Sequence, residues 1–338
     1  MTRPLLFACV VALTGGMGLP VPLPAQTTDI KEWPVEWGGR TRDPYVAPDG
    51  LVWFVGQAGN YIANLDPTTG ALEQFEIEAG TNPHSLIVAP DGYVWYTGNR
   101  NGRIGRLDPQ TGEVKTYMMP ERAVRDPHSL VFDGKGNIWF TAQGASRVGR
   151  LNMASGKIDL INPHDAPANP YGIVVDHDGR PWVNLFRTNM IATVDPTTLA
   201  VSKFEVVPEG GRTRRIAMTP DGMMWWVDYA RGYVGRFDPQ TEQTEEWLAP
   251  GGAQARPYAI TADDRGRLWF SETGAQKRLI GFDPATEEFF SINEVSGTIR
   301  NMMFHKETGT MWFGTDANKV GRALVDRAVI LVIAGRCR

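Results

Sequence analysis

A single tryptophan recurs along this chain at an almost constant interval. The seven copies are separated by 42 to 44 residues, at Trp53, Trp95, Trp139, Trp182, Trp225, Trp269 and Trp312. Most copies follow a turn sequence such as Asp49-Gly50, and a second apolar stretch such as "YVGRFDP" (233–239) comes after each one. Repeats of this length, with four short strands separated by turn residues, are typical of β-propeller blades.

The seven units predict an all-β fold, a seven-bladed β-propeller built from four-stranded antiparallel blades. Asp-Gly suits tight hairpins because glycine readily adopts a positive φ. The last unit ends after its third strand, at 319–325, whereas residues 30–37 resemble the fourth strands of the other units. We therefore predict that the N-terminal strand completes the last blade, which closes the ring and leaves no exposed sheet edge. The tryptophans are expected to pack between blades.

The two ends of the chain differ in character from the repeats. Residues 1–26 resemble a secretory signal peptide, with Arg3, an apolar run at 5–13 and a cleavage position near Ala25. Residues 27–325 form the predicted propeller, and the tail at 326–338 fits no blade. Removal of the signal would leave Cys337 as the last cysteine, so no internal disulfide is expected. Export without disulfides favours the periplasm.

Composition excludes several classes of protein. The chain has 338 residues, is 42% apolar and carries a formal net charge of −4, which disfavours nucleic acid as a partner because such proteins present a basic face. No Cys-x-x-Cys-His motif occurs, so covalent haem is not expected. The apolar runs are too short for a stable membrane span. The expected state is a monomer that binds a small molecule.

The candidate site comes from aligning the units on their tryptophans. Inner strands of a propeller begin at one channel mouth, and such mouths commonly bind ligands. The residues eleven positions before the tryptophans are polar and differ between units: His84, His128, Tyr171, Arg214, Tyr258 and Asn301, with Tyr45 assigned to this place in the first unit. Neighbouring positions at the same mouth add Arg212, Arg256, Asp228 and Glu272.

These residue types suggest two kinds of chemistry. Clustered arginines suit an anionic ligand or paired carboxylates, and Asp228 and Glu272 could be such partners. The histidines and tyrosines suit proton transfer or stacking. Structural explanations remain open: His84 and His128 could cap the starts of strands, and the arginines could hold blades in register by pairing with acids across the channel.

The repeated pattern P-x-x-[IL]-x-x-x-x-D-G-x-[VIL]-W-[FY], followed by I-G-R-[IL]-D-P, resembles the virginiamycin B lyase (streptogramin lyase) family over nearly the whole chain after the signal. That resemblance implies a seven-bladed propeller that opens a cyclic depsipeptide without water. A base removes a proton α to a carbonyl, magnesium stabilises the enolate, and the ester C–O bond breaks by elimination.

The resemblance also implies site residues. The family's basic histidine falls on Tyr258, its substrate-contacting histidine on Arg214, and its two metal carboxylates on Arg256 and Glu272. Only Glu272 keeps the family's residue type. A tyrosine with an ordinary pKa near 10 is a poor base at neutral pH, and an arginine repels a metal ion.

Three functions follow as hypotheses. The first is an exported lyase-like enzyme acting on a cyclic depsipeptide, a lactone or a similar small molecule. In it Tyr258, His84 and His128 are the catalytic candidates, and Glu272 is the magnesium ligand. Substrate binding falls to Tyr45, Tyr171, Arg212, Arg214, Arg256 and Asp228. The second is a non-catalytic periplasmic propeller that binds an anionic ligand. The third, a calcium-dependent lactonase propeller, is disfavoured because such propellers have six blades. The residues leave open whether the chain is an enzyme.

Overall fold

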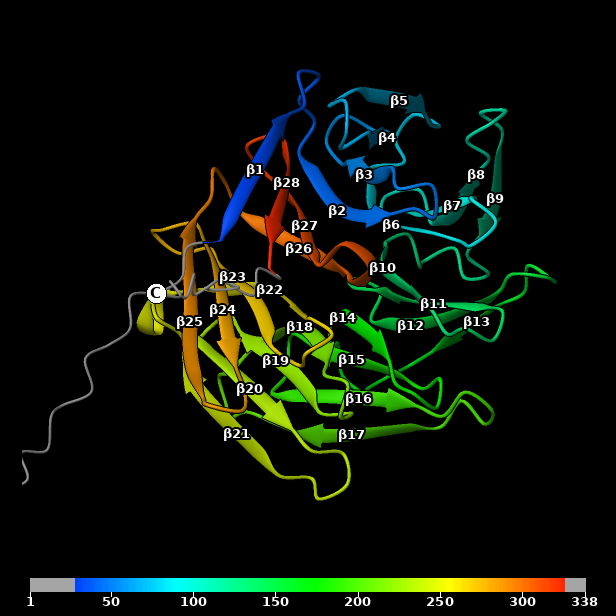
Figure 1. Ribbon diagram of the computed structural model, residues 1–338. Coiled ribbons are helices and arrows are strands. Elements are labelled where there is room, and N and C mark those ends of the chain that lie inside the picture. Colours follow the sequence, from blue (N-terminus) through cyan, green and yellow to red (C-terminus); the bar gives the residue numbers. More distant parts are fainter. Residues whose placement is uncertain (1–27, 326–338) are drawn as a thin grey trace, which may run out of the picture.

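Seven four-stranded antiparallel sheets form a closed ring in the computed structural model, which describes residues 28–325 (Figure 1). The predicted seven-bladed propeller is therefore confirmed. The predicted signal peptide at 1–26 and the tail at 326–338 lie outside the described residues. Within the described range, no helix is long and apolar enough to cross a membrane.

Each blade takes four strands that are consecutive in sequence, except the last. Blades 1 to 3 contain β2 (Thr41–Val46), β3 (Val52–Gly56), β4 (Tyr61–Leu65), β5 (Leu72–Glu76), β6 (Pro83–Val88), β7 (Val94–Gly98), β8 (Arg103–Leu107), β9 (Val114–Met118), β10 (Pro127–Phe132), β11 (Asn137–Ala142), β12 (Arg147–Asn152) and β13 (Ile158–Ile161). Blades 4 and 5 contain β14 (Pro170–Val175), β15 (Pro181–Leu185), β16 (Met190–Val194), β17 (Val201–Glu205), β18 (Thr213–Met218), β19 (Met224–Asp228), β20 (Tyr233–Phe237) and β21 (Thr244–Leu248). Blades 6 and 7 contain β22 (Pro257–Ala262), β23 (Leu268–Glu272), β24 (Arg278–Asp283), β25 (Glu288–Glu294), β26 (Ile299–His305), β27 (Thr310–Thr315) and β28 (Lys319–Leu324), with short 3-10 helices η1 (Gly252–Gln254) and η2 (Lys306–Thr308).

The ring closes through the first described strand. β1 (Asp29–Pro34) pairs antiparallel with β28, with Asp29 opposite Leu324, so that blade 7 has the order β1-β28-β27-β26 (Figure 1). The ring of Trp33 stacks on that of Trp312, with centroids 5.7 Å apart. The predicted N-terminal closing strand is confirmed.

The core consists of apolar clusters between neighbouring blades. In one of them Trp53 of blade 1 packs with Leu86 and Tyr96 of blade 2. All seven repeating tryptophans are at most 4% exposed, which confirms their role between blades. Several third strands carry a glycine under an aromatic ring of the second strand: a Cβ at Gly149 would collide with the ring of Phe140. Glycine is needed there because it leaves room for the ring of the paired residue in the same blade.

A β-bulge follows the start of every inner strand. The inner strands β2, β6, β10, β14, β18, β22 and β26 contact one another in order around the axis. In blade 2, Pro83 pairs with Gly98 and pairing resumes at Leu86, and the other six blades have a shift at the corresponding place. A bulge re-aims side chains. It therefore determines which residues reach the channel.

Candidate functional site

Seven side chains occupy equivalent places at the inner-strand bulges. Strand pairing gives them as Arg42, His84, His128, Tyr171, Arg214, Tyr258 and Arg300. The assignment of Tyr45 to this ring is wrong, because Tyr45 pairs with Trp53 and Arg42 holds the place of His84. The assignment of Asn301 to this ring is off by one residue. The turn of blade 7 that contains η2 is one residue longer, so Arg300, not Asn301, stands at the position equivalent to His84.

The histidines and tyrosines of blades 2, 3, 4 and 6 form one contiguous row. The rings of His84 and His128 lie 3.5 Å apart between centroids, and that of Tyr171 lies 4.3 Å from His128. The hydroxyl groups of Tyr171 and Tyr258 are hydrogen-bonded to each other. All four residues are at most 3% exposed. The structure thus brings the predicted catalytic residues together with Tyr171.

The two histidines are uncharged parts of this row. Burial lowers the pKa of His84 well below its ordinary value, and Arg42 lowers it further; burial and Arg215 do the same to His128. Nδ1 of His84 bonds to the backbone oxygen of His128 (3.1 Å), so it connects two blades. Nδ1 of His128 bonds to Ser129 Oγ (2.9 Å), which itself accepts from Arg215 (2.8 Å).

The guanidinium group of Arg214 is enclosed by aromatic rings. It lies 3.7 Å from the centroid of the Tyr258 ring, and it contacts three further rings: Tyr229 at 4.4 Å, Phe186 at 4.8 Å and Tyr171 at 4.9 Å. Its Nη2 donates to the Tyr171 hydroxyl at 3.3 Å. Such desolvated cation–π contacts are favourable and fix the position of the cation. Arg214 is therefore a fixed positive charge on the Tyr171–Tyr258 pair.

The two phenols have opposite pKa shifts. Burial raises the pKa of Tyr258, but the positive charges of Arg214, Arg42 and Arg215 outweigh burial and bring the pKa down to about 7. Burial raises the pKa of Tyr171, and the neighbouring Tyr258 raises it further. Tyr171 therefore keeps its proton and donates it in the hydrogen bond, while Tyr258 is the phenol that ionises near neutral pH.

Positive charge exceeds negative charge at the base of this ring. Arg42 and Arg215 are each 5% exposed, and the single carboxylate between them is Asp43, 1% exposed, at 3.6 Å from each guanidinium group. Nε and Nη2 of both arginines lack hydrogen-bond partners, as do both carboxylate oxygens. Uncompensated buried cations are costly, and they favour any neighbouring group that takes a negative charge.

The predicted acids of the mouth have other partners. Glu272 accepts from Nε of Arg278 (2.7 Å) and from the backbone N–H of Gly251 (2.7 Å). Asp228 is tied in the same way, to Arg231 Nε (2.6 Å) and to the backbone N–H of Arg212 (3.0 Å). Both acids hold the loops that enter the inner strands. They do not pair with the channel arginines.

Magnesium ligation by the family's pattern does not fit these residues. Both oxygens of Glu272 already accept hydrogen bonds, one of them from a cation, and the position of the second carboxylate is the exposed Arg256. Within residues 28–325 no group of three or more His, Cys, Asp or Glu side chains is arranged to hold a metal ion. A magnesium ion needs several oxygen ligands in near-octahedral order, and these positions do not supply them.

Outer residues surround the buried ring. Arg212 and Arg256 are exposed, at 5.8 Å from the Phe186 ring and 5.7 Å from the Tyr229 ring. Phe186 and Tyr229, which follow the second strands of blades 4 and 5, were not predicted from the sequence. Arg42 was not predicted either, although it stands eleven residues before Trp53, because Tyr45 was assigned to that place. The pairs Phe186/Tyr171 and Tyr229/Tyr258 have centroids 5.5 Å and 6.1 Å apart, so the two residues extend the aromatic row outward.

Tyr45 belongs to the opposite end of the channel. There it lines a cavity of about 800 Å³ with apolar walls that include Val88, Phe132, Met303 and Phe304. On β2 it stands three residues beyond Arg42, toward the turn into β3, where residues such as Pro48 and Gly50 line the same cavity. A role for Tyr45 beside Arg214 and Tyr258 does not agree with this placement.

Comparison with known proteins agrees with the architecture. The sequence model described as the virginiamycin B lyase family matches residues 28–323. A streptogramin B lyase structure has 25% identity and a TM-score of 0.79, covering 88% of this chain and 97% of that chain. A catalytically inactive histidine-to-alanine variant of virginiamycin B lyase from Staphylococcus aureus, with quinupristin, has 25% identity and a TM-score of 0.79, covering 88% and 99%.

More distant structures share the fold alone. Hydrazine synthase of Kuenenia stuttgartiensis has 13% identity and a TM-score of 0.72, covering 87% of this chain and 98% of that chain. The extracellular domain of a hybrid two-component system from B. thetaiotaomicron has 16% identity and a TM-score of 0.71, covering 89% and 43%. The comparison with curated proteins found no match.

Proposed function

The chain belongs to the virginiamycin B lyase family, and from that premise we propose that it is an elimination-type carbon–oxygen lyase with Tyr258 as its base. The substrate would be a cyclic depsipeptide, a lactone or a similar small molecule. The observation that carries the proposal is the pKa of about 7 for Tyr258, at the position where the family has its basic histidine. This value replaces the ordinary pKa near 10 expected from sequence.

The step needs a proton acceptor and a group that stabilises negative charge. The Tyr258 phenolate takes the α proton of a carbonyl compound that carries an ester oxygen on its β carbon. The C–H electron pair becomes a C=C bond, and the C–O bond breaks with its electrons on the departing carboxylate. Tyr258 ends protonated, and no water is consumed.

Arg214 and Tyr171 would stabilise the charge that develops. Arg214 carries a positive charge held by four aromatic rings, 3.7 Å from the Tyr258 ring centroid. Preorganised donors in a site of low dielectric constant are worth several kcal/mol to a developing enolate. In this proposal the arginines supply the positive charge that magnesium supplies by family resemblance. The mouth residues Arg212 and Arg256 would attract an anionic or carbonyl-rich substrate.

The turnover experiment uses a streptogramin B ester, followed by mass spectrometry. Elimination opens the ring without changing the mass, whereas hydrolysis adds the mass of one water. We expect ring opening at unchanged mass, and equal rates with and without a magnesium chelator. If the substrate is still intact after long incubation, the chain does not carry out the reaction of its family. If the chelator abolishes turnover, the role given to Arg214 is contradicted.

One tyrosine should titrate far below the others. We expect one phenol of the folded protein to ionise near pH 7, seen in the ultraviolet difference spectrum and absent from Tyr258→Phe. The fraction of Tyr258 that is phenolate should increase as pH rises through 7, and kcat/KM should increase with it. Because the folded pKa lies below the unfolded value near 10, the stability that the Tyr258 phenolate adds is complete above pH 10. It decreases as pH falls from 10 and is lost below the folded pKa of about 7. A spectrum in which every phenol ionises above pH 9 contradicts the assignment.

A second candidate function is binding of an anion without chemistry. The buried side-chain nitrogens of Arg42, Arg214 and Arg215 that lack hydrogen-bond partners favour it. A carboxylate-bearing ligand would then raise the melting temperature of the wild type but not of Arg214→Ala/Arg256→Ala. If the ligand is recovered chemically unchanged after incubation with the protein, the protein binds it without acting as a lyase on it.

Export remains part of the proposal. The apolar run at 5–13 and the exit near Ala25 support removal of a leader and delivery to the periplasm. The expected result is a mature protein that begins near residue 27 in the periplasmic fraction, checked by intact mass. Full-length protein confined to the cytosol would contradict it.

A further inference from the structure

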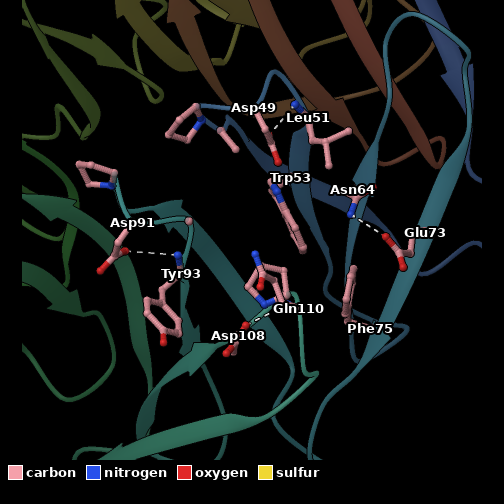
Figure 2. A pocket seen from close by; sticks show the side chains of 15 residues that line it. Asp49, Leu51, Trp53, Asn64, Glu73, Phe75, Asp91, Tyr93, Asp108 and Gln110 are labelled. Atoms are coloured by element: carbon pink, nitrogen blue, oxygen red, sulfur yellow. Dashed lines mark hydrogen bonds between the residues drawn. The ribbon is translucent and has the colours of Figure 1, made fainter.

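A cavity of about 530 Å³ opens between blades 1 and 2, on the face of the ring that carries the turns after β2 and β6 (Figure 2). One wall comes from blade 1, with Trp53, Asn64, Glu73 and Phe75; the other comes from turns of blade 2 that include Asp91, Tyr93, Asp108 and Gln110. In Figure 2 the ring of Trp53 lies between Asn64 with Glu73 on one side and Asp108 with Gln110 on the other. The proposed lyase site makes no use of it.

Blades 3 and 5 show one set of residues that this place can hold. In blade 3 the register aligns Trp139 with Arg150 and Arg150 with Asp159. The guanidinium carbon of Arg150 lies 5.5 Å from the Trp139 ring, and the group pairs with Asp159 at 2.7 Å. Its Nη1 also donates to the backbone oxygen of Pro196, in the next blade, at 2.6 Å.

Blade 5 repeats the arrangement. Trp225 aligns with Arg236, and Arg236 with Glu245. The guanidinium carbon lies 5.8 Å from the Trp225 ring, and Nη2 pairs with Glu245 at 2.5 Å. Ring, guanidinium and carboxylate therefore form the same unit in blades 3 and 5, with a cation–π contact and an ion pair.

Blade 1 keeps two parts of this unit and lacks the third. Trp53 aligns with Asn64, and Asn64 with Glu73, so asparagine stands where Arg150 and Arg236 stand. The amide of Asn64 donates to Glu73 at 3.2 Å, but it carries no charge and is too short to cover the ring. Pro109, which corresponds to Pro196 in the turn of the next blade, lines the cavity as well.

The space left by the missing side chain agrees with this comparison. The corresponding groove between blades 5 and 6, where Arg236 is present, has a volume of about 330 Å³, against about 530 Å³ here. Among the described residues that line the larger cavity, none is basic, and four are acidic: Asp49, Glu73, Asp91 and Asp108. The cavity therefore combines the aromatic ring of Trp53, the carboxylate of Glu73 and an acidic rim formed by Asp49, Asp91 and Asp108.

We propose that this cavity binds a ligand carrying a guanidinium group, which replaces the arginine that blade 1 lacks. The group stacks on Trp53, pairs with Glu73 and donates to the backbone oxygen of Pro109, as Arg150 does with its equivalents. A planar guanidinium with forked donors meets all three partners, whereas an ammonium is a single point of charge. The acidic rim favours a second positive charge on the same molecule.

Agmatine is the probe, measured by calorimetric titration on the full chain. We expect one site per chain, and weaker binding of putrescine, which has an ammonium in place of the guanidinium. Asn64→Arg should abolish binding, because the chain then supplies the cation itself. Glu73→Gln should weaken binding about tenfold or more, since bonds to charged partners are the strong ones.

The matched control uses the sister groove. Arg236→Asn removes the arginine from the Trp225–Glu245 unit, and it should raise the number of agmatine sites from one to two. Melting temperatures establish that each variant is folded. Absence of binding to the wild type, binding that survives in folded Asn64→Arg, or a single site in folded Arg236→Asn each overturns the proposal. None of these changes touches the channel, so they should leave streptogramin turnover unaltered.

Discussion

Replacing Tyr258 with phenylalanine should lower kcat by about 10²–10⁴-fold, the usual contribution of a positioned general base. The change removes one oxygen from a residue that is 3% exposed and keeps the ring under Arg214. KM should change little, because the ring and the cation that contact the substrate remain. The measurement is steady-state turnover of the streptogramin ester across a range of pH.

Tyr229→Phe is the matched control for this change. Its ring also contacts the Arg214 guanidinium, at 4.4 Å, and lies 6.1 Å from the Tyr258 ring, but it has no place in the proposed proton transfer. It should keep the wild-type rate and the wild-type pH profile. If Tyr258→Phe retains more than a tenth of the activity, Tyr258 is not the base and the proposed step is wrong.

Replacing Asp43 with asparagine should destabilise the protein by about 3–5 kcal/mol, the cost of breaking a buried ion pair on one side only. Asp43 is the carboxylate placed at 3.6 Å from both Arg42 and Arg215. Without it, two nearly buried guanidinium groups lose their negative neighbour. The free energy of unfolding is measured by denaturant titration at neutral pH.

The control for this change is Asp49→Asn, an exposed acid in the turn that follows the same strand. It should change the unfolding free energy by less than about 0.5 kcal/mol. Arg42→Met added to Asp43→Asn should recover part of the loss, since one of the unpaired cations is then gone. A stability of Asp43→Asn equal to that of the wild type would show that these charges are compensated elsewhere.

The fold could be predicted because its determinants are local and repeated. The repeating tryptophan stands at a similar number of residues from its turn in each blade. Counting the regularly spaced tryptophans in the sequence therefore gives the number of blades. The closing strand was also predictable, because residues 30–37 carry the alternation of the other outer strands. Register at the channel was harder. The turn of blade 7 contains η2 and shifts Arg300 into the place expected for Asn301.

The chemistry of the site depends on contacts between blades that are far apart in sequence. The pKa of Tyr258 follows from burial and from Arg214, Arg42 and Arg215, which come from blades 5 and 1. No local pattern brings these residues together. Glu272 and Asp228 differ in this respect, because their partners Arg278 and Arg231 stand only six and three residues further along the chain. These local ion pairs leave both acids unavailable to the channel.

The pairing of β1 with β28 has a consequence for how the molecule can vary. A linear repeat protein can gain or lose one repeat at an end and keep the rest, because each repeat contacts only its neighbours. Here the first and last described strands share a sheet, so the array has no terminal unit to lose. Deletion of any blade would open the ring, and closing it again would require a change in the angle between every pair of remaining blades. Side chains at fixed places, such as Asn64 and Tyr258, can by contrast be exchanged without changing the number of blades.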